Sequence, residues 1–234
     1  MDEIFSKKKL QIIIPILFGV IYLSAFKNGK QTCDRYFVNY FLYLLTSLAV
    51  YFYSSTELDF DISANRIKSL ITALLLFGLI FALQMVDNIY IKHIIWFSII
   101  IILGIFAKKY HEKFNEKEVK SVLKKLIIVL LVCIGIALIF PQILKPNLEI
   151  ALLFGLLITL ILRVLDQFVF KKDYSKTISY LVIFIFSAFV MYDTKRVMEF
   201  SKKCVDGKTG YLNNVLNMFL NVVNIFNNLL LVNE

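Results

Sequence analysis

The stretch Leu126–Phe140 reads LIIVLLVCIGIALIF and contains no charged side chain. It ends an apolar segment, Val122–Phe140, and seven more such segments lie along the chain: Leu10–Phe26, Tyr36–Tyr53, Leu70–Val86, Ile89–Ala107, Leu148–Leu162, Ile178–Tyr192 and Tyr211–Val232. A bilayer core of ~30 Å needs about 20 helical residues, with ~17 at the low end. The segments lack the alternation of barrel strands. The sequence therefore predicts an all-α, polytopic helical bundle in a membrane.

Composition leads to the same class of protein. Of the 234 residues, 59% are hydrophobic and 18% are charged, against roughly 45–50% and about 25% in an average soluble domain. Too few polar side chains remain to cover a soluble surface, and a disordered chain would be poor in apolar residues. The linkers are short and none is rich in Gly, Ser or Pro, so we expect one membrane domain over residues 1–234.

The net charge of +9 comes from short breaks between the apolar segments, the richest being Lys108–Lys125. A nucleic-acid partner is not expected, because it would need a basic face on a folded module. With eight spans, alternate breaks hold 16 and 10 Lys and Arg residues; without Leu148–Leu162 the division is 17 and 9. The positive-inside rule does not choose between these counts, but both place the N-terminus and Lys108–Lys125 in the cytosol.

The N-terminal lysines followed by Leu10–Phe26 have the layout of a signal peptide. The apolar part is longer than usual and no small-x-small cleavage site follows, so we expect a retained first helix. Cys33, Cys133 and Cys204 are odd in number and widely spaced, which predicts neither a disulfide scaffold nor a zinc ribbon. His93 has no obvious partner and the spans contain no Ser/His/Asp or Cys/His set, so we do not expect an enzyme or a cofactor.

Asp193 ends the segment Ile178–Tyr192, and ionisable groups in a span are candidates for function. Two interpretations remain open for this carboxylate. It pairs with Lys195, Arg196 or lipid headgroups at the interface, or it faces the interior of the bundle.

The last segment carries a stripe of asparagines that fall within an arc of ~140° on a helix: Asn213, Asn214, Asn217, Asn221, Asn224, Asn227 and Asn228. Such a stripe must face protein or water, because unsatisfied amides are costly in hydrocarbon. We expect lipid on the opposite face, formed by Leu216, Phe219, Val222, Val223 and Ile225. The amides either hold helices together or line a path for a hard cation such as Ca²⁺.

Arg163 and Asp166 form a third polar group, at the end of Leu148–Leu162. Their i,i+3 spacing predicts an ion pair on one helix face.

Two strings near the C-terminus resemble the Bax-inhibitor-motif (TMBIM) membrane family, as a divergent member. The string at 187–195, SAFVMYDTK, is similar to the family's sixth-helix ending, in which a hydrophobic run closes on Tyr-Asp-Thr. The string at 211–226, YLNNVLNMFLNVVNIF, is similar to its seventh helix. The resemblance covers about 45 residues, and the earlier part of the chain agrees in hydropathy alone.

The resemblance implies seven helices with the last one central, in an intracellular or bacterial inner membrane. It also implies a role in calcium leak and in the suppression of cell death. The family's pH-sensing pair of aspartates carries over to Asp193 and to position 221, which is Asn here. Two close carboxylates cannot both ionise easily. An Asp–Asn pair keeps a hydrogen bond but loses this repulsion, so we expect a latch or weak calcium site with a blunted pH response.

The family's topology places the loop after Asp193 on the same side as the N-terminus, which requires six spans before that loop. One of the eight segments must then be set aside. Leu148–Leu162 is chosen, as a re-entrant or partly buried segment, because its 15 apolar residues run into Arg163 and Asp166. We therefore expect seven spans, or eight if this segment also crosses.

Two functions follow as expectations. The first is a calcium leak, or a regulator of one, in an ER- or Golgi-type membrane; the ion path or latch would use Asp193, Asn217, Asn221, Asn224 and Asn228, with Asp193 as a weak Ca²⁺ ligand. The second is a non-conducting protein that inhibits apoptosis by binding other membrane proteins of cell-death pathways.

Overall fold

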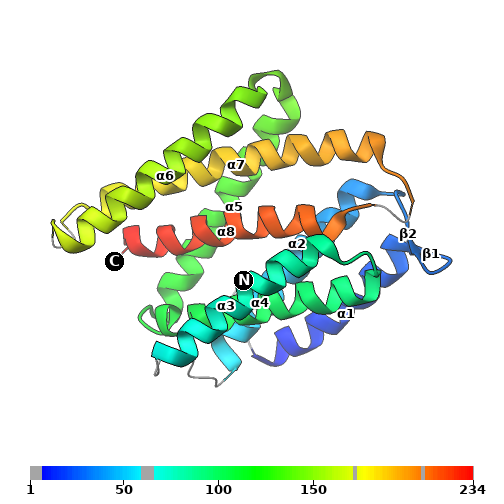
Figure 1. Ribbon diagram of the computed structural model, residues 1–234, viewed down its shortest axis with the longest axis horizontal. Helices are drawn as coiled ribbons and strands as arrows, with labels where there is room; N and C mark the ends of the chain where they lie inside the picture. The colour runs from blue at the N-terminus through cyan, green and yellow to red at the C-terminus, as the bar shows by residue number, and fades with distance from the viewer. Residues whose placement is uncertain (1–6, 59–65, 171–172, 207–208, 234) are drawn as a thin grey trace. The chain divides into compact units, whose positions relative to one another are not determined.

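The computed structural model describes residues 7–58, 66–170, 173–206 and 209–233, and in these residues it is almost entirely helical (Figure 1). The α-helices are α1 (Lys7–Ala25), α2 (Tyr36–Glu57), α3 (Arg66–Met85), α4 (Ile89–His111), α5 (Glu116–Ile139), α6 (Pro146–Phe168), α7 (Ser175–Lys203) and α8 (Tyr211–Asn233). A short hairpin of β1 (Phe26–Lys27) and β2 (Lys30–Gln31) follows α1, and a 3-10 turn, η1 (Pro141–Ile143), follows α5. The predicted all-α membrane bundle is confirmed.

Seven of these helices are long and apolar enough to cross a membrane, namely α2 to α8. The sequence-based choice of Leu148–Leu162 as the segment to set aside is wrong. The helix α6 continues past Leu162 to Phe168, and its 23 residues reach about 34 Å. The shorter apolar helix is instead Lys9–Ala25 in α1.

The chain divides into two compact units, 1–114 with 203–216 and 115–202 with 217–234. In the first unit α2 is the inner helix, since 61% of its apolar window is buried, against 6% for α3. Helix α2 packs against α1 and α4. An aromatic cluster lies in this core. The ring of Tyr43 packs edge-on against Trp96, with 5.6 Å between the ring centroids, and stacks on Tyr211, with 5.5 Å between the centroids. The exposed apolar side chains of α3 are the kind that contact lipid.

Gly104 marks the closest approach of α4 to α2. A Cβ at Gly104 would lie 2.6 Å from Ser54 Cβ and 2.7 Å from the carbonyl oxygen of Tyr51. We expect Gly104→Ala to lower the free energy of unfolding by about 1–3 kcal/mol, because the two backbones must separate. Thermal unfolding in detergent measures the effect. Gly78→Ala on α3 is the matched control: a Cβ there meets nothing within 4 Å, and we expect a gain of about 0.4–1 kcal/mol. Equal melting temperatures for the two variants would contradict the close contact.

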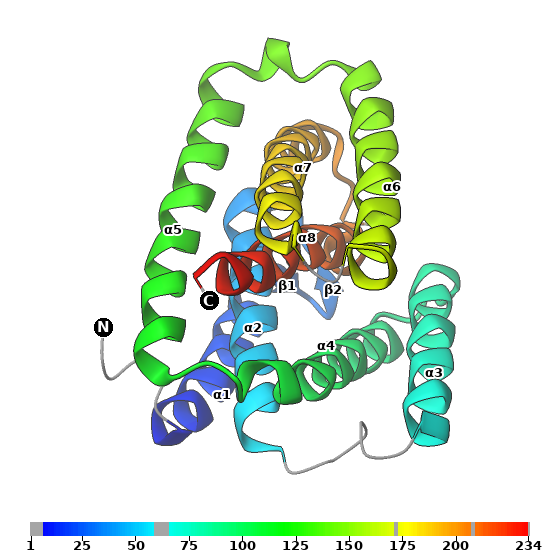
Figure 2. The same ribbon diagram turned by 90° about the vertical axis from the view of Figure 1, so that its left-hand side faces the viewer.

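The second unit contains α5, α6, α7 and most of α8. Figure 2 shows α7 between α5 and α6. On one side of α7, Ile185 and Ala188 pack against Leu152 of α6. Lys125 of α5 donates a hydrogen bond to Asn233 Oδ1 of α8 at 2.5 Å. The first contact packs α6 against the helix that carries Asp193, and the second joins α5 to α8.

The sequence-based prediction that the apolar face of α8 contacts lipid is wrong. Phe219, Val222 and Ile225 are fully buried and Leu216 is 3% exposed. The asparagine-bearing face also makes protein contacts, described below. The side of α8 that was predicted to face lipid is therefore covered by protein.

Candidate functional site

Asp193 and Asn221 meet in the second unit, on α7 and α8. The amide Nδ2 of Asn221 donates a hydrogen bond to Oδ2 of Asp193 at 2.7 Å. Asp193 is 8% exposed, so its carboxylate lies inside the protein rather than among lipid headgroups. Arg196 and Glu149 lie within electrostatic range of this carboxylate. A buried carboxylate that accepts an amide hydrogen bond is stabilised in place, and breaking that bond would be costly.

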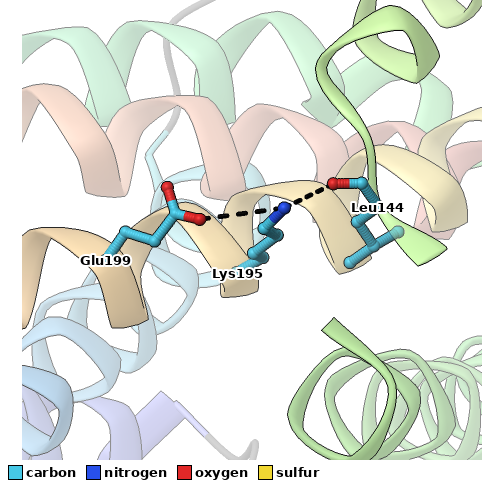
Figure 3. Close-up of polar contacts among 3 residues, drawn as sticks. All are labelled: Leu144, Lys195 and Glu199. Atoms are coloured by element: carbon cyan, nitrogen blue, oxygen red, sulfur yellow. Dashed lines mark hydrogen bonds and ion pairs between the residues drawn. The ribbon is translucent and has the colours of Figure 1, made fainter. Parts of the chain in front are cut away.

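Lys195 follows Asp193 but turns in a different direction. Its ammonium donates a hydrogen bond to the carbonyl oxygen of Leu144 at 2.5 Å and lies 3.7 Å from a carboxylate oxygen of Glu199 (Figure 3). Lys195 thereby ties α7 to the residue after η1. The interfacial pair of Asp193 with Lys195, one of the two interpretations left open by the sequence, is not the arrangement that these contacts form.

Side chains of the asparagine stripe of α8 donate hydrogen bonds either to other helices or to backbone carbonyls of α8 itself. Asn213 donates to Gln84 of α3 at 2.9 Å and Asn214 to Tyr36 of α2 at 3.2 Å. Asn224 donates to the carbonyl of Leu220, one turn back on α8. These contacts correspond to the first of the two interpretations, interhelical hydrogen bonding.

Asn228 belongs to a second polar cluster, centred on Arg163 of α6. The guanidinium donates to Asn228 Oδ1 and to Ser179 Oγ, both at 2.6 Å, and to Ser175 Oγ at 3.1 Å. Asn228 itself donates to the carbonyl of Asn224. Arg163 thereby joins α6 to α7 and α8 through neutral acceptors.

Asp166 is buried, and its carboxylate accepts a hydrogen bond from the backbone N–H of Tyr174 at 2.9 Å. It thus holds the connection that leads into α7. The predicted ion pair between Asp166 and Arg163 stays a prediction.

The ion path predicted along the asparagines of α8 stays a prediction. Asn217 is exposed, whereas Asn221, Asn224 and Asn228 already make the hydrogen bonds given above. Within the described residues no group of three or more His, Cys, Asp and Glu side chains could hold a metal ion. Asp193 therefore stands with an amide partner rather than in a carboxylate cage, an arrangement suited to a closed contact between helices.

Two features were missed by the sequence-based analysis. Tyr43 is the partner of His93, with its hydroxyl 2.8 Å from Nε2. Cys33 and Cys204 form a disulfide, with their Cα atoms 5.8 Å apart. One signal could have indicated this pair: each cysteine stands shortly before an apolar segment, at Tyr36 and at Tyr211.

The disulfide also limits the number of crossings between its two cysteines. Cys33 and Cys204 must lie on the same face of the membrane, so an even number of spans separates them. The six helices α2 to α7 satisfy this condition. Setting α6 aside would leave five and would place the two cysteines on opposite faces.

Comparison with models of protein families gives a match. Residues 33–232 match the family model described as inhibitor of apoptosis-promoting Bax1. The matched part begins at Cys33, so it contains α2 to α8 and leaves α1 outside. Comparison with curated proteins finds no match. Because the family model covers most of the chain, and seven helices of the chain are candidate membrane spans, the protein belongs to the Bax-inhibitor family of multi-pass membrane proteins.

Proposed function

We propose that the protein suppresses cell death from an intracellular membrane by modulating a calcium leak, with the Asp193–Asn221 contact as the latch. The observation that carries this proposal is the 2.7 Å hydrogen bond between two buried segments of α7 and α8. An intact bond holds the two helices together and keeps the pathway closed. Because the donor is an amide, the bond has no like-charge repulsion that protons could relieve.

Calcium efflux from proteoliposomes tests the latch. Asp193→Ala removes the acceptor and leaves the Asn221 amide unpaired, so we expect faster efflux than from the wild type. Asp173→Ala, which removes an exposed carboxylate from the connection before α7, is the matched control and is expected to leave efflux unchanged. Efflux that is the same for Asp193→Ala and the wild type would contradict a latch at this position.

A second function, a non-conducting protein that binds other membrane proteins of cell-death pathways, is favoured by the use of the α8 amides in helix contacts. It involves no enzyme chemistry and no cofactor. The two functions differ in one measurement. An interaction protein protects cells from a death stimulus but gives no calcium efflux in liposomes, with either Asp or Ala at position 193.

For the membrane orientation, we propose that all eight helices cross, with the N-terminus and Lys108–Lys125 in the cytosol. The disulfide supports this, because disulfides persist in the lumen or outside the cell and are rare in the cytosol. The division of 16 and 10 basic residues supports it too. Loops 26–35 and 204–210 then lie in the lumen, together with the η1 turn between α5 and α6.

Cysteine accessibility in sealed microsomes tests this orientation. Lys113 and Lys145 are both exposed and lie on loops that the proposal places on opposite faces. A membrane-impermeant maleimide should label Lys113→Cys in intact vesicles and Lys145→Cys only after the membrane is opened. The reverse pattern would invert the orientation, and labelling of both in intact vesicles would contradict it.

A further inference from the structure

Three lysines form a stripe along the first turns of α5, a different helix from those that carry Asp193 and Asn221. Lys117, Lys120 and Lys124 have the spacing i, i+3 and i+7, which places them within an arc of ~60° on a helix. Lys117 and Lys124 are exposed and Lys120 is half-buried. From the first lysine to the last the helix rises by ~10 Å. This lysine stripe therefore presents three positive charges within about two turns of one helix face.

The helix beneath the lysine stripe is fixed by contacts within the protein. Asn115 and Glu118 form a capping box at the start of α5, in which the carboxylate of Glu118 accepts a hydrogen bond from the N–H of Asn115 at 3.0 Å. On the opposite side of α5, Val122 and Leu126 are buried. The lysine stripe therefore lies on the outer side of an ordered helix, and a ligand there would not have to order the backbone.

The same face of α5 continues into an apolar surface. Ile128 and Leu131 lie four and seven residues after Lys124, so they share its side of the helix. They are 61% and 64% exposed. In a helix that crosses a membrane, exposed side chains of this kind contact the acyl chains of lipids. A ligand that touches both parts of this face has a charged headgroup and an apolar chain.

The length of α5 places the lysine stripe at the level of lipid headgroups. Its uncharged part, residues 126–139, reaches ~21 Å along the helix. The hydrocarbon core of a bilayer is thicker, ~30 Å. Lysines near the end of a span extend their ammonium groups to the interface, while their methylene stems stay against apolar groups. The ammonium groups of Lys120 and Lys124 are therefore within reach of the phosphates of the lipids beside α5.

We propose that this face of α5 binds a phosphoinositide, with its headgroup phosphates at Lys117, Lys120 and Lys124 and an acyl chain along Ile128 and Leu131. The headgroup has to carry several negative charges, because the lysine stripe presents three positive ones. A phosphatidylserine headgroup carries a single net negative charge, and a phosphomonoester on the inositol ring adds about 1.5 to 2 more. Basic clusters on the cytosolic side of a membrane helix attract lipids of this kind. The proposed orientation places the stripe on that side.

Binding of short-chain lipids to the full chain in detergent tests the choice of headgroup. The probes are dioctanoyl phosphatidylinositol 4-phosphate and dioctanoyl phosphatidylserine, which have the same chains and enter micelles alike. Native mass spectrometry counts the lipid molecules bound at each concentration. We expect the phosphoinositide to bind at least about tenfold more tightly, because its additional charges face the lysine stripe. Higher salt should weaken the binding.

Variants of the lysine stripe test its position. Lys117→Gln, Lys120→Gln and Lys124→Gln should each weaken phosphoinositide binding about fivefold, and the triple variant about a hundredfold. Lys124→Arg keeps the charge and should bind as the wild type does. The matched control is Lys68→Gln in the first turn of α3. Lys68 is exposed and also precedes an exposed apolar face, but positions i+3 and i+7 from it are Ile71 and Leu75. This control should leave binding unchanged.

Four outcomes would overturn the proposal. The first is equal affinity for the two lipids, which would show a general attraction to negative surfaces. The second is an equal loss of binding in Lys68→Gln and Lys124→Gln. The third is displacement of the lipid by an equal concentration of glycerophosphoinositol 4-phosphate, which would show a site for a soluble anion. The fourth is no binding of the phosphoinositide. The comparison of lipids uses the wild type, so it decides even if a variant fails to fold. None of these readouts depends on calcium flux.

Discussion

Loss of the Cys33–Cys204 disulfide is expected to lower the free energy of unfolding by about 2–5 kcal/mol. The bond joins residues 171 positions apart, and a cross-link across so long a loop restricts the unfolded chain most strongly. It also holds the loop before α8, where Asp206 accepts a hydrogen bond from the N–H of Cys33 at 2.7 Å. Thermal unfolding of Cys204→Ser in detergent should show a melting temperature several degrees below that of the wild type.

Reductant provides the internal control for this variant. Dithiothreitol should lower the melting temperature of the wild type to that of Cys204→Ser and leave the variant unchanged. Cys133→Ala removes the third cysteine, which is free and buried, and should keep the response to reductant. If alkylation finds Cys33 and Cys204 as free thiols in the native protein, the predicted loss disappears with the bond.

The membrane fold could be predicted from the sequence because apolar segments of this length are typical of few structures other than membrane-spanning helices. The error at Leu148–Leu162 has a specific cause. The segment was ended at Arg163 because a charged side chain in a span is costly. In the structure both residues remain in α6 because their polar groups have partners. Arg163 donates hydrogen bonds to Ser179 and Asn228. Asp166 accepts one from the N–H of Tyr174. Partners on other helices cannot be derived from the segment alone.

The same limit explains the error on α8. Periodicity correctly separates an amide face from an apolar face, but it does not say what covers the apolar face. Phe219 and Val222 are buried by protein rather than lipid. The contact between Asp193 and Asn221 was predicted from the family resemblance instead. The resemblance pairs these two positions, which are 28 residues apart in the sequence. The disulfide could not be predicted from the residues around each cysteine, because it depends on which loops lie on the same face of the membrane.

Replacing Asn221 with aspartate is expected to make calcium efflux strongly dependent on pH, whereas efflux through the wild type stays nearly constant from pH 6 to 8. The variant places a second carboxylate where the amide donor stood, 2.7 Å from Asp193. At low pH the pair shares a proton and keeps a hydrogen bond between α7 and α8. As the pH rises the proton is lost and the two charges repel, so the latch opens.

The size of the effect follows from the repulsion. Two like charges about 4 Å apart interact by about 4 kcal/mol at an effective dielectric constant of 20. Arg196 offsets part of this and Glu149 adds to it, since both lie within electrostatic range. A net ~1.4 kcal/mol already changes an equilibrium tenfold, so we expect efflux to rise at least about tenfold between pH 6 and 8. The melting temperature of the variant should fall over the same range, because the repulsion acts on the folded state.

Two control variants make the test specific to the pair. Asn217→Asp adds the same charge at an exposed position of α8 and should leave the pH response flat. The exchange Asp193→Asn with Asn221→Asp restores one carboxylate and one amide donor, so it should return the flat response of the wild type. A steep response in the wild type that Asp193→Asn abolishes would show that the amide does not blunt the latch. The Asn221→Asp variant could also show no change of melting temperature or efflux with pH. That result would show that residues 193 and 221 do not form a latch, because repulsion between two facing carboxylates must either destabilise the fold or open the contact.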